Sequence, residues 1–325
     1  MTSTGLSESH PLPIRIGVSR CLLGEQVRYD GGHKRDRFVT DVLSRHVEWV
    51  PICPEVEAGM TTPREPMRLE GDVLHPELIT IKTGRNMTRQ LADYTERKLG
   101  SLAGDGLSGY IFKKDSPSCG VTRVRVFDRH GLPIRSGVGL FARAFTKQYP
   151  LVPVEDEGRL SDPAIRDNFI ERVCSYYRFQ RLGQGGLTRE KIVRFHTIHK
   201  YLVLAHSRGH YQTLGRLVAH AHVYRSAQLY ERYGPLFMQA LSVKTTLRKH
   251  VNVLQHIVGH LKDRLQADER QELDAVIREY HQGFVPLVVP ITLLQHYAGV
   301  YDVSYLREQV YLTPYPKELK LRNYV

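Results

Sequence analysis

The chain has 325 residues, of which 41% are hydrophobic and 25% charged, and its formal net charge is +12. This composition is typical of a globular protein, and the length suggests two domains that each bury a core. The sequence has no apolar run long enough to span a bilayer, and residues 1–10 lack the pattern of a signal peptide. We therefore expect a cytoplasmic protein with reduced thiols, which excludes a disulfide framework.

Three apolar segments in the first half of the chain are typical of short buried strands, and a cysteine follows each of them. Helical patterns lie between these segments, at residues 37–44 and 89–99. Alternating strands and helices predict a parallel sheet, and ligands of such sheets bind at the carboxyl ends of the strands. We therefore expect the cysteines to meet at one edge. The segments and their cysteines are 14–19 with Cys21, 47–52 with Cys53, and 108–114 with Cys119.

Three thiols at one edge of a sheet are typical of metal ligands, and the turns around them are rich in Gly, Pro, Asp and Ser. Zinc usually takes four ligands, and His33 can complete a set of three cysteines and one histidine. An iron–sulfur cluster also suits three cysteines, because each holds one iron and a fourth iron stays open. The spacing alone leaves zinc, iron, buried core cysteines and a cysteine nucleophile all open.

The stretches VSRCLLGEQVRYDGGHKR, CPEVEAGMTTPREPMRLEG and KKDSPSCG resemble, in this order, the TudS family of thiouracil desulfurases. The resemblance covers about residues 14–150. It implies a 4Fe-4S cluster held by Cys21, Cys53 and Cys119, with one iron that the protein does not ligate. Cys174 lies outside these stretches on a predicted helix, where we expect it to pack in the core.

The reaction that this resemblance implies replaces a C=S group by C=O and releases sulfide, so it needs groups that move protons. The resemblance favours Glu55 and Ser116 as catalytic groups. Glu55 is alternatively a charge in the first turn of a helix, and Ser116 is alternatively a turn hydroxyl. The candidates for substrate binding are Asp30, Arg28, Arg64 and Ser118.

The second half of the chain is predicted to be helical after a linker at 151–162, where prolines and three consecutive acidic residues interrupt the pattern. Eleven of the sixteen histidines lie in this half. Several share a helical face, which suits hydrogen bonds between helices or contacts to nucleic acid; the alternative is a metal site. The helices expected are one that Thr188 caps, then 211–232, 244–265 and 268–280, followed by an apolar segment around Pro290 that packs onto them.

Residues 159–250 hold 16 Lys or Arg against 5 Asp or Glu, and such a basic block attracts polyanions. The stretches FHTIHKYLVLAHS and KHVNVLQHIVGHLK resemble a YbgA-type domain, over about residues 185–322. Behind a TudS-like domain, this pair resembles the RudS type of desulfidase, which acts on 4-thiouridine in tRNA. The residues expected to meet phosphate are His199, Lys200, Arg208, Lys244, Arg248 and Lys249.

We therefore predict an α/β N-terminal domain at 1–150 with a parallel, Rossmann-like sheet, and a mainly α-helical, basic C-terminal domain at 163–325. The expected function is 4Fe-4S-dependent, non-redox, hydrolytic desulfuration of 4-thiouridine in tRNA. The alternatives are the same chemistry on free 2-thiouracil or 4-thiouracil, and a non-catalytic nucleic-acid-binding protein stabilised by zinc. We expect tRNA as the partner, no membrane and no obligatory protein partner, and the sequence leaves the oligomeric state open.

Overall fold

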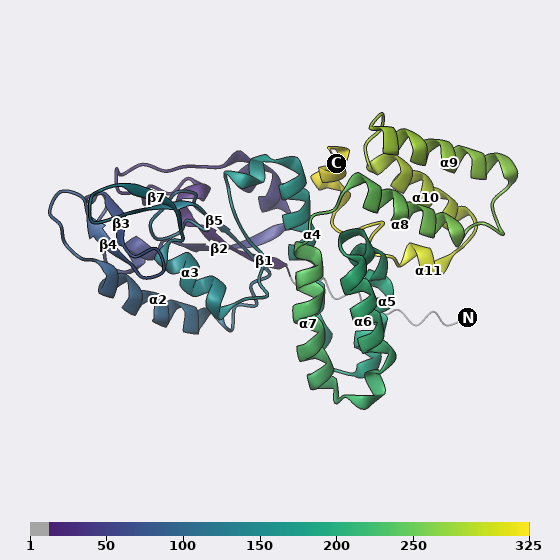
Figure 1. Cartoon of the computed structure of the whole chain (residues 1–325), viewed down its shortest axis with the longest axis horizontal. Helices are drawn as coiled ribbons and strands as arrows, with labels where there is room; N and C mark the ends of the chain where they lie inside the picture. Colours follow the sequence, from purple (N-terminus) through teal and green to yellow (C-terminus); the bar gives the residue numbers. More distant parts are fainter. Residues whose placement is uncertain (1–12, 325) are drawn as a thin grey trace, which may run out of the picture. The chain divides into compact units, whose positions relative to one another are not determined.

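The computed structural model describes residues 13–324, and the chain divides into two compact units, Met1–Gln148 and Tyr149–Val325 (Figure 1). The first unit contains strands and helices, whereas helices dominate the second. This division confirms the predicted fold class. Within the described residues, no helix is both long enough and apolar enough to cross a membrane.

A parallel sheet forms the core of the first unit, as predicted from its apolar segments. Its central strand β1 (Ile14–Ser19) pairs with β2 (Val47–Ile52) on one side and with β5 (Gly109–Phe112) on the other. The register sets Ser19 beside Ile52, so the carboxyl ends of these two strands are level. All three strands run in one direction, and the residues that follow them therefore gather at one edge.

Gly17 makes this sheet possible, because the ring of Tyr110 occupies the space where a side chain would be. A Cβ atom at position 17 would lie 2.2 Å from Cδ2 of Tyr110. The Tyr110 ring is fully buried and stacks on Phe112, with 3.8 Å between the ring centroids. The glycine thus lets a large aromatic cluster lie directly against the central strand.

In the described part of the first unit, three α-helices accompany the strands, namely α1 (Pro54–Glu57), α2 (Thr88–Leu102) and α3 (Leu140–Gln148). The helix predicted at 37–44 is instead a π-helical turn over Phe38–Val42 followed by a 3₁₀ turn. So short a segment gains few helical hydrogen bonds, and tertiary contacts decide its form.

A second sheet in the first unit was not predicted from the sequence. Its strand order is β4-β3-β6-β7, in which β3 pairs antiparallel with β4 and parallel with β6, and β6 pairs antiparallel with β7. Apolar residues on one face of this sheet, including Leu69 and Val126, are fully buried. The strands are β3 (Met67–Gly71), β4 (Pro76–Thr80), β6 (Val124–Phe127) and β7 (Pro133–Gly137).

The second unit packs its helices around one apolar core. The helix α5 lies against α6, α7 and α8, and α10 lies against α9 and α8. Thr188 caps α5 as predicted, and its side chain accepts a hydrogen bond from the Lys191 N–H. The helices are α4 (Pro163–Gln180), α5 (Arg189–His206), α6 (Arg208–Ala219), α7 (Ser226–Ser242), α8 (Leu247–Gly259), α9 (Ala267–Gln282), α10 (Val288–Val300) and α11 (Ser304–Arg307).

Two segments of the second unit differ from the prediction. The single helix expected at 211–232 is two helices, α6 and α7, because the chain reverses between them and both pack on α5. The segment expected as a linker contains the short strand β8 (Val154–Asp156) and a 3₁₀ turn. Glu155 is buried there, and its carboxylate accepts a hydrogen bond from Arg159 Nε at 2.7 Å, so the acidic run is part of the folded structure.

Candidate active site

Three cysteines from three strand ends line a single cavity of about 620 Å³ in the first unit. Cys21 lies in the turn that follows β1, and Cys53 follows β2 directly and is the N-cap residue of α1. Cys119 lies in the turn that follows β5. The parallel sheet therefore brings together side chains that are up to 98 residues apart in the sequence.

The three thiols are buried and close enough to influence one another. Burial raises the pKa of Cys119 well above its ordinary value, and the neighbouring Cys53 and Cys21 raise it further. Burial also raises the pKa of Cys53. Such thiols give up their protons when they bind a metal, because a coordinated thiolate is stabilised by the metal charge.

The set of three cysteine donors suits an iron–sulfur cluster, because each cysteine of a cluster can bind a different iron. Thiolates around one zinc stand only about 3.8 Å apart, whereas the cysteines of a cluster each bind a different iron. Within the described residues, no three His, Cys, Asp or Glu side chains are placed to hold one ion. His33, which the zinc alternative needs, is exposed, and its Nδ1 accepts a hydrogen bond from the Arg35 N–H at 3.2 Å.

Glu55 lies on the wall of the same cavity, and two side chains hold its carboxylate. Arg64 donates to Oε2 from Nε at 2.9 Å and also from its Nη2. Ser118 is fully buried, and its hydroxyl donates to Oε1. Arg64 is itself fixed by Val27, whose carbonyl oxygen accepts from its Nη1 at 3.1 Å. The carboxylate therefore has a fixed position beside the cysteines.

The other residues predicted for this site take different places. Ser116 lines the cavity, but its Oγ also accepts hydrogen bonds from the N–H groups of Ser118 and Cys119, as a turn hydroxyl does. Arg28 lines the cavity, and Asp30 forms an ion pair with it at 3.4 Å. Ser118 is fully buried and is not among the residues that line the cavity, and its hydroxyl donates to Glu55. The substrate contact expected of it stays a prediction.

A second carboxylate, which was not predicted from the sequence, orients the backbone of Cys53. Glu57 Oε1 accepts a hydrogen bond from the Cys53 N–H at 2.9 Å. Its other oxygen accepts from the Tyr94 hydroxyl at 2.6 Å and lies 3.2 Å from Lys98 Nζ. Burial and this hydrogen bond raise the pKa of Tyr94. The CPEVE pattern signals an acidic first turn, but nothing local to it indicates partners on α2.

Comparisons with known proteins identify the family of the first unit. The sequence model of a family described as 2-thiouracil desulfurase matches residues 16–157. The uncharacterized protein YbbK of Bacillus subtilis (strain 168) is 33% identical over 110 residues, which are 32% of this chain and 72% of that protein. The chain belongs to the 2-thiouracil desulfurase family. Its first unit is therefore a thiouracil desulfurase domain.

A second family model, DUF1722, described as a protein of unknown function, matches residues 200–316 of this desulfurase-family chain. The uncharacterized protein YbgA of Escherichia coli (strain K12) is 32% identical over 158 residues, which are 48% of this chain and 94% of that protein. The resemblance to a TudS-like domain followed by a YbgA-type domain is thereby confirmed. Among solved structures, the [4Fe-4S]-dependent thiouracil desulfidase TudS is 30% identical and covers 46% of this chain and 93% of its own, with a TM-score of 0.38.

One of the phosphate contacts predicted for the second unit is wrong, since His199 is fully buried. Its Nδ1 bonds the Phe195 carbonyl oxygen at 2.8 Å, and its ring stacks on that of Phe195. Burial lowers the pKa of His199 to about 3, so the ring is neutral and faces the core. Lys200 is half-buried, with its ammonium 5.2 Å from the ring centroid of Tyr201 and 5.0 Å from that of Tyr305.

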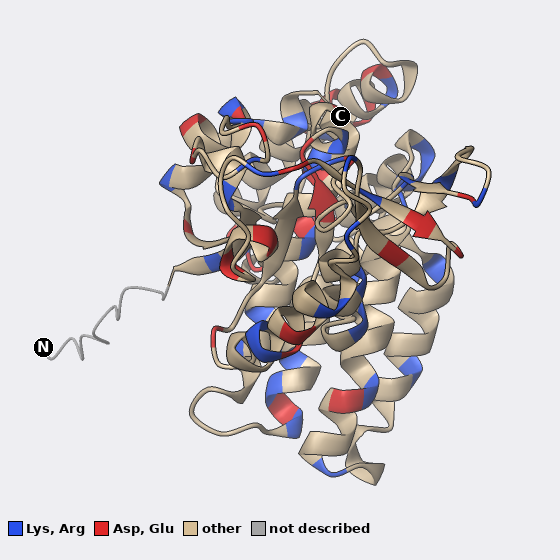
Figure 2. Cartoon of the chain, turned by 90° about the vertical axis from the view of Figure 1, so that its left-hand side faces the viewer, with Lys and Arg blue, Asp and Glu red and all other residues tan. Residues whose placement is uncertain are grey.

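The remaining basic candidates gather at two neighbouring turns of the second unit. Lys249 Nζ donates to the His206 carbonyl at 2.7 Å and to the Lys244 carbonyl at 2.9 Å. It thereby ties the turn between α5 and α6 to the turn between α7 and α8. Arg208 is the first residue of α6 and Arg248 is the second residue of α8. Both side chains are exposed, as is that of Lys244. Figure 2 shows that Lys and Arg also occur on the strands and loops of the chain.

The histidine pairs of this unit serve mainly as hydrogen-bonding groups between helices, which was one of the predicted uses. His196 Nδ1 lies 3.2 Å from the Tyr233 hydroxyl, and His206 Nε2 lies 2.5 Å from Glu171 Oε1. His260 Nε2 lies 2.6 Å from the hydroxyl of a tyrosine on α5. The metal alternative has no support among the described residues.

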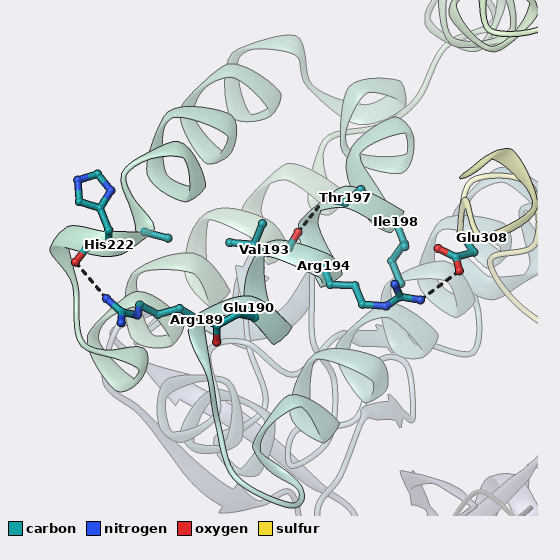
Figure 3. Close-up of a pocket in the computed structure, with 9 residues that line it drawn as sticks. Arg189, Glu190, Val193, Arg194, Thr197, Ile198, His222 and Glu308 are labelled. Atoms are coloured by element: carbon teal, nitrogen blue, oxygen red, sulfur yellow. Dashed lines mark hydrogen bonds and ion pairs between the residues drawn. The ribbon is translucent and has the colours of Figure 1, made fainter. Parts of the chain in front are cut away.

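A further cavity of about 570 Å³ lies along the N-terminal half of α5 (Figure 3). Arg194 forms an ion pair with Glu308 at 3.1 Å, and Arg189 donates a hydrogen bond to the His222 carbonyl at 3.1 Å. Figure 3 shows these two arginines extending away from each other along the helix. The residues that line this cavity include no thiol, and its arginines already have protein partners.

Proposed function

We propose that this chain is a 4Fe-4S-dependent desulfidase that converts 4-thiouridine in tRNA to uridine and releases sulfide. The observation that carries the proposal is the single cavity lined by Cys21, Cys53 and Cys119, with Glu55 on its wall. The family supports thiouracil chemistry, and the basic second unit supports an RNA substrate.

The three cysteines are the residues that would hold the cluster. Three thiol ligands for four irons leave one iron without a protein ligand. When bound, such a cluster supplies a Lewis acid that favours the soft sulfur of a thione. Glu57 keeps the backbone of Cys53 in place through its hydrogen bond at 2.9 Å, and it is a positioning residue.

Glu55 is the residue that we propose to move the proton of the attacking water. Its carboxylate is held by Arg64 and by Ser118, so it cannot turn away when the substrate binds. Water adds its oxygen to the carbon of the C=S group, the bond to sulfur breaks, and the two hydrogens of the water leave with the sulfur as hydrogen sulfide. No electrons are gained or lost, so the reaction is a hydrolysis.

The second unit is proposed to bind the RNA. Arg208, Lys244 and Arg248 lie at two turns that Lys249 joins, and they present positive charge to solvent. Contacts of this kind position a nucleic acid through its phosphates without reading its sequence. A base that is stacked in tRNA must also leave the stack to reach a buried site. Contacts of the second unit with the RNA backbone would hold the RNA while the base is out of the stack.

Free thiouracil is the second candidate substrate, because the description of the matching family names 2-thiouracil. The cavity of about 620 Å³ is large enough for a single base. Activity on the free base that is unaffected by a phosphate or by tRNA would favour this alternative.

The test is anaerobic reconstitution with iron and sulfide, followed by addition of tRNA that contains 4-thiouridine. We expect loss of the thione absorbance, release of sulfide, and loss of cluster and activity together in Cys53→Ala. The matched control is Cys174→Ala, a buried cysteine on α4, which should keep both. Bound cluster without any reaction on tRNA would refute the RNA substrate, and zinc in place of iron would refute the cofactor.

A further inference from the structure

His206, the last residue of α5, is buried, and each nitrogen of its ring faces an oxygen atom. Its Nδ1 lies 2.6 Å from the carbonyl oxygen of Val243, and its Nε2 lies 2.5 Å from Oε1 of Glu171. A carbonyl oxygen can only accept a hydrogen bond, and the same holds for an ionised carboxylate. A neutral imidazole donates from one nitrogen only, so beside an ionised Glu171 the ring must carry a proton on both nitrogens.

The surroundings of this pair keep the Glu171 carboxylate ionised. Arg322, a buried residue near the C-terminus, lies 3.4 Å from the other oxygen of this carboxylate. Burial alone raises the pKa of Glu171, but the positive charges of His206 and Arg322 outweigh burial and lower the pKa below its ordinary value. The ionisable groups that face His206 are Glu171 and Asp167 on α4, Lys249 and His250 on α8, and Arg322.

A charged His206 also balances the charges of the buried groups in this set. His250 is neutral, because burial lowers its pKa to about 3. Burial raises the pKa of Asp167 to about 6, so this carboxyl is ionised at neutral pH. Glu171 and Asp167 then meet two positive groups, Arg322 and the His206 ring. With a neutral ring, one buried carboxylate lacks a counter-charge, which is strongly unfavourable.

The hydrogen bond to Val243 connects two turns of the second unit. Val243 is the C-cap residue of α7, so the His206 ring ties the turn between α5 and α6 to the turn between α7 and α8. The backbone carbonyl of His206 accepts from Lys249 Nζ between the same two turns at 2.7 Å. Arg208 is two residues after His206, and Lys244 directly follows Val243. The ring therefore helps to set the spacing of the exposed cations on these turns.

We infer that His206 is a buried imidazolium that positions the two basic turns, and that the binding of RNA phosphates by these turns depends on its proton. Loss of the proton leaves the ring with one donor for two acceptors, so one of its two hydrogen bonds is lost. The inference rests on the proposed function, because it takes the RNA ligand from that function. It adds a positioning residue beneath the exposed cations and a dependence of RNA binding on pH.

The first measurement is the NMR spectrum of the imidazole nitrogens in the full-length, cluster-loaded protein with isotope-labelled histidine, between pH 6 and pH 9. The signals of His206 are assigned by their absence from His206→Gln. We expect both ring nitrogens of His206 to carry protons at pH 6, and both protons to exchange slowly with solvent because the ring is buried. A ring with one bare nitrogen at pH 6 would overturn the inference.

The second measurement is the affinity for an unmodified tRNA transcript, which has no thione and cannot react, over the same pH range. The affinity should fall about tenfold as the ring loses its proton, with the same midpoint as the ring titration. The salt dependence of binding should weaken by about one phosphate contact in the same step. His206→Gln should bind about tenfold more weakly than the unchanged protein at pH 6 and should lose this pH dependence.

Two further variants separate a loss of charge from a loss of fold. Glu171→Gln removes the negative charge that faces the ring, so the midpoints of ring titration and RNA binding should move to lower pH together. The matched control is His256→Gln, an exposed histidine of α8, which should change neither the affinity nor its pH dependence. An unchanged pH dependence of binding in both His206→Gln and Glu171→Gln would refute the positioning role. If the protein binds no tRNA at any pH, the proposed RNA substrate fails, while the NMR spectrum still decides whether His206 is charged.

Discussion

Lowering the pH from 7.5 to 5.5 should destabilise the helical second unit far more than the α/β unit. The reason is the burial of histidines as neutral rings. Burial lowers the pKa of His196 to about 4, and it lowers the pKa of His199 and of His250 to about 3. These values lie below the ordinary 6.5, so the unfolded chain takes up protons in this pH range that the folded chain does not.

The size of the effect follows from the proton linkage. At pH 5.5 a histidine with pKa 6.5 in the unfolded chain is about 90% protonated, which stabilises that chain by about 1.4 kcal/mol per residue. Protonation of the three histidines therefore stabilises the unfolded chain by about 4 kcal/mol. Asp167 acts in the opposite direction, because burial raises its pKa to about 6 and the folded chain takes up its proton first. Protonation of that carboxyl stabilises the folded chain by about 0.8 kcal/mol at pH 5.5. The free energy of unfolding therefore falls by about 3 kcal/mol in total.

The two units can be followed separately during unfolding in urea. Trp49, the single tryptophan of the chain, lies on β2 and reports the first unit through its emission. Ellipticity at 222 nm reports mainly the helices of the second unit. We expect the free energy of unfolding from ellipticity to fall by about 3 kcal/mol between pH 7.5 and 5.5. The Trp49 transition should move much less, since no histidine described in the first unit is buried.

A pair of variants isolates the cause. His199→Phe keeps a ring between its aromatic neighbours and removes the titrating group. The free energy of unfolding of this variant should therefore fall by about 1.4 kcal/mol less between pH 7.5 and 5.5. His256→Gln changes an exposed histidine of α8 and should recover nothing. An equal shift of both transitions, or an unchanged acid loss in His199→Phe, would refute the reasoning.

Three substitutions test the packing and capping of the two units. Gly17→Ala places a methyl group 2.2 Å from the Tyr110 ring, and the Trp49 transition should lose about 2 kcal/mol or more of stability. Asp162→Ala removes the carboxylate that accepts two N–H groups at the start of α4, and ellipticity should report a loss of about 1 kcal/mol. Cys174→Ala leaves a small cavity in the core and should cost about 1 kcal/mol with no loss of bound iron. A stable Gly17→Ala protein would mean that the aromatic cluster can shift.

The sequence predicted the strands that carry the cysteines because their apolar residues are continuous and local. Residues 14–19 and 47–52 are strands with the predicted bounds. The second sheet escaped prediction because β6 and β7 are short, and three of the five residues of β7 are polar or glycine. Its pairing of β3 with β6 joins residues more than fifty positions apart, which no local pattern indicates.

Among the predicted site residues, some could be placed from the local sequence and others could not. Cys21, Cys53 and Cys119 could be named because each directly follows a recognisable strand or its turn, and parallel strands end at one edge. His199 was misplaced, because a histidine next to a lysine has the same local pattern whether its ring faces solvent or the core. Its burial follows from contacts with Phe195 on its own helix and Phe237 on α7.

The sequence by itself determined the α/β and helical fold class and placed the three cysteines after strands, because strand, helix and turn preferences are local. The tertiary structure alone decided which groups surround those thiols. The hydrogen bonds that Arg64 and Ser118 donate to Glu55 join chain segments that are far apart in the sequence. The opposition of Arg125 and Arg135 depends on strand register, because a shift of one residue moves a side chain to the other face of the sheet.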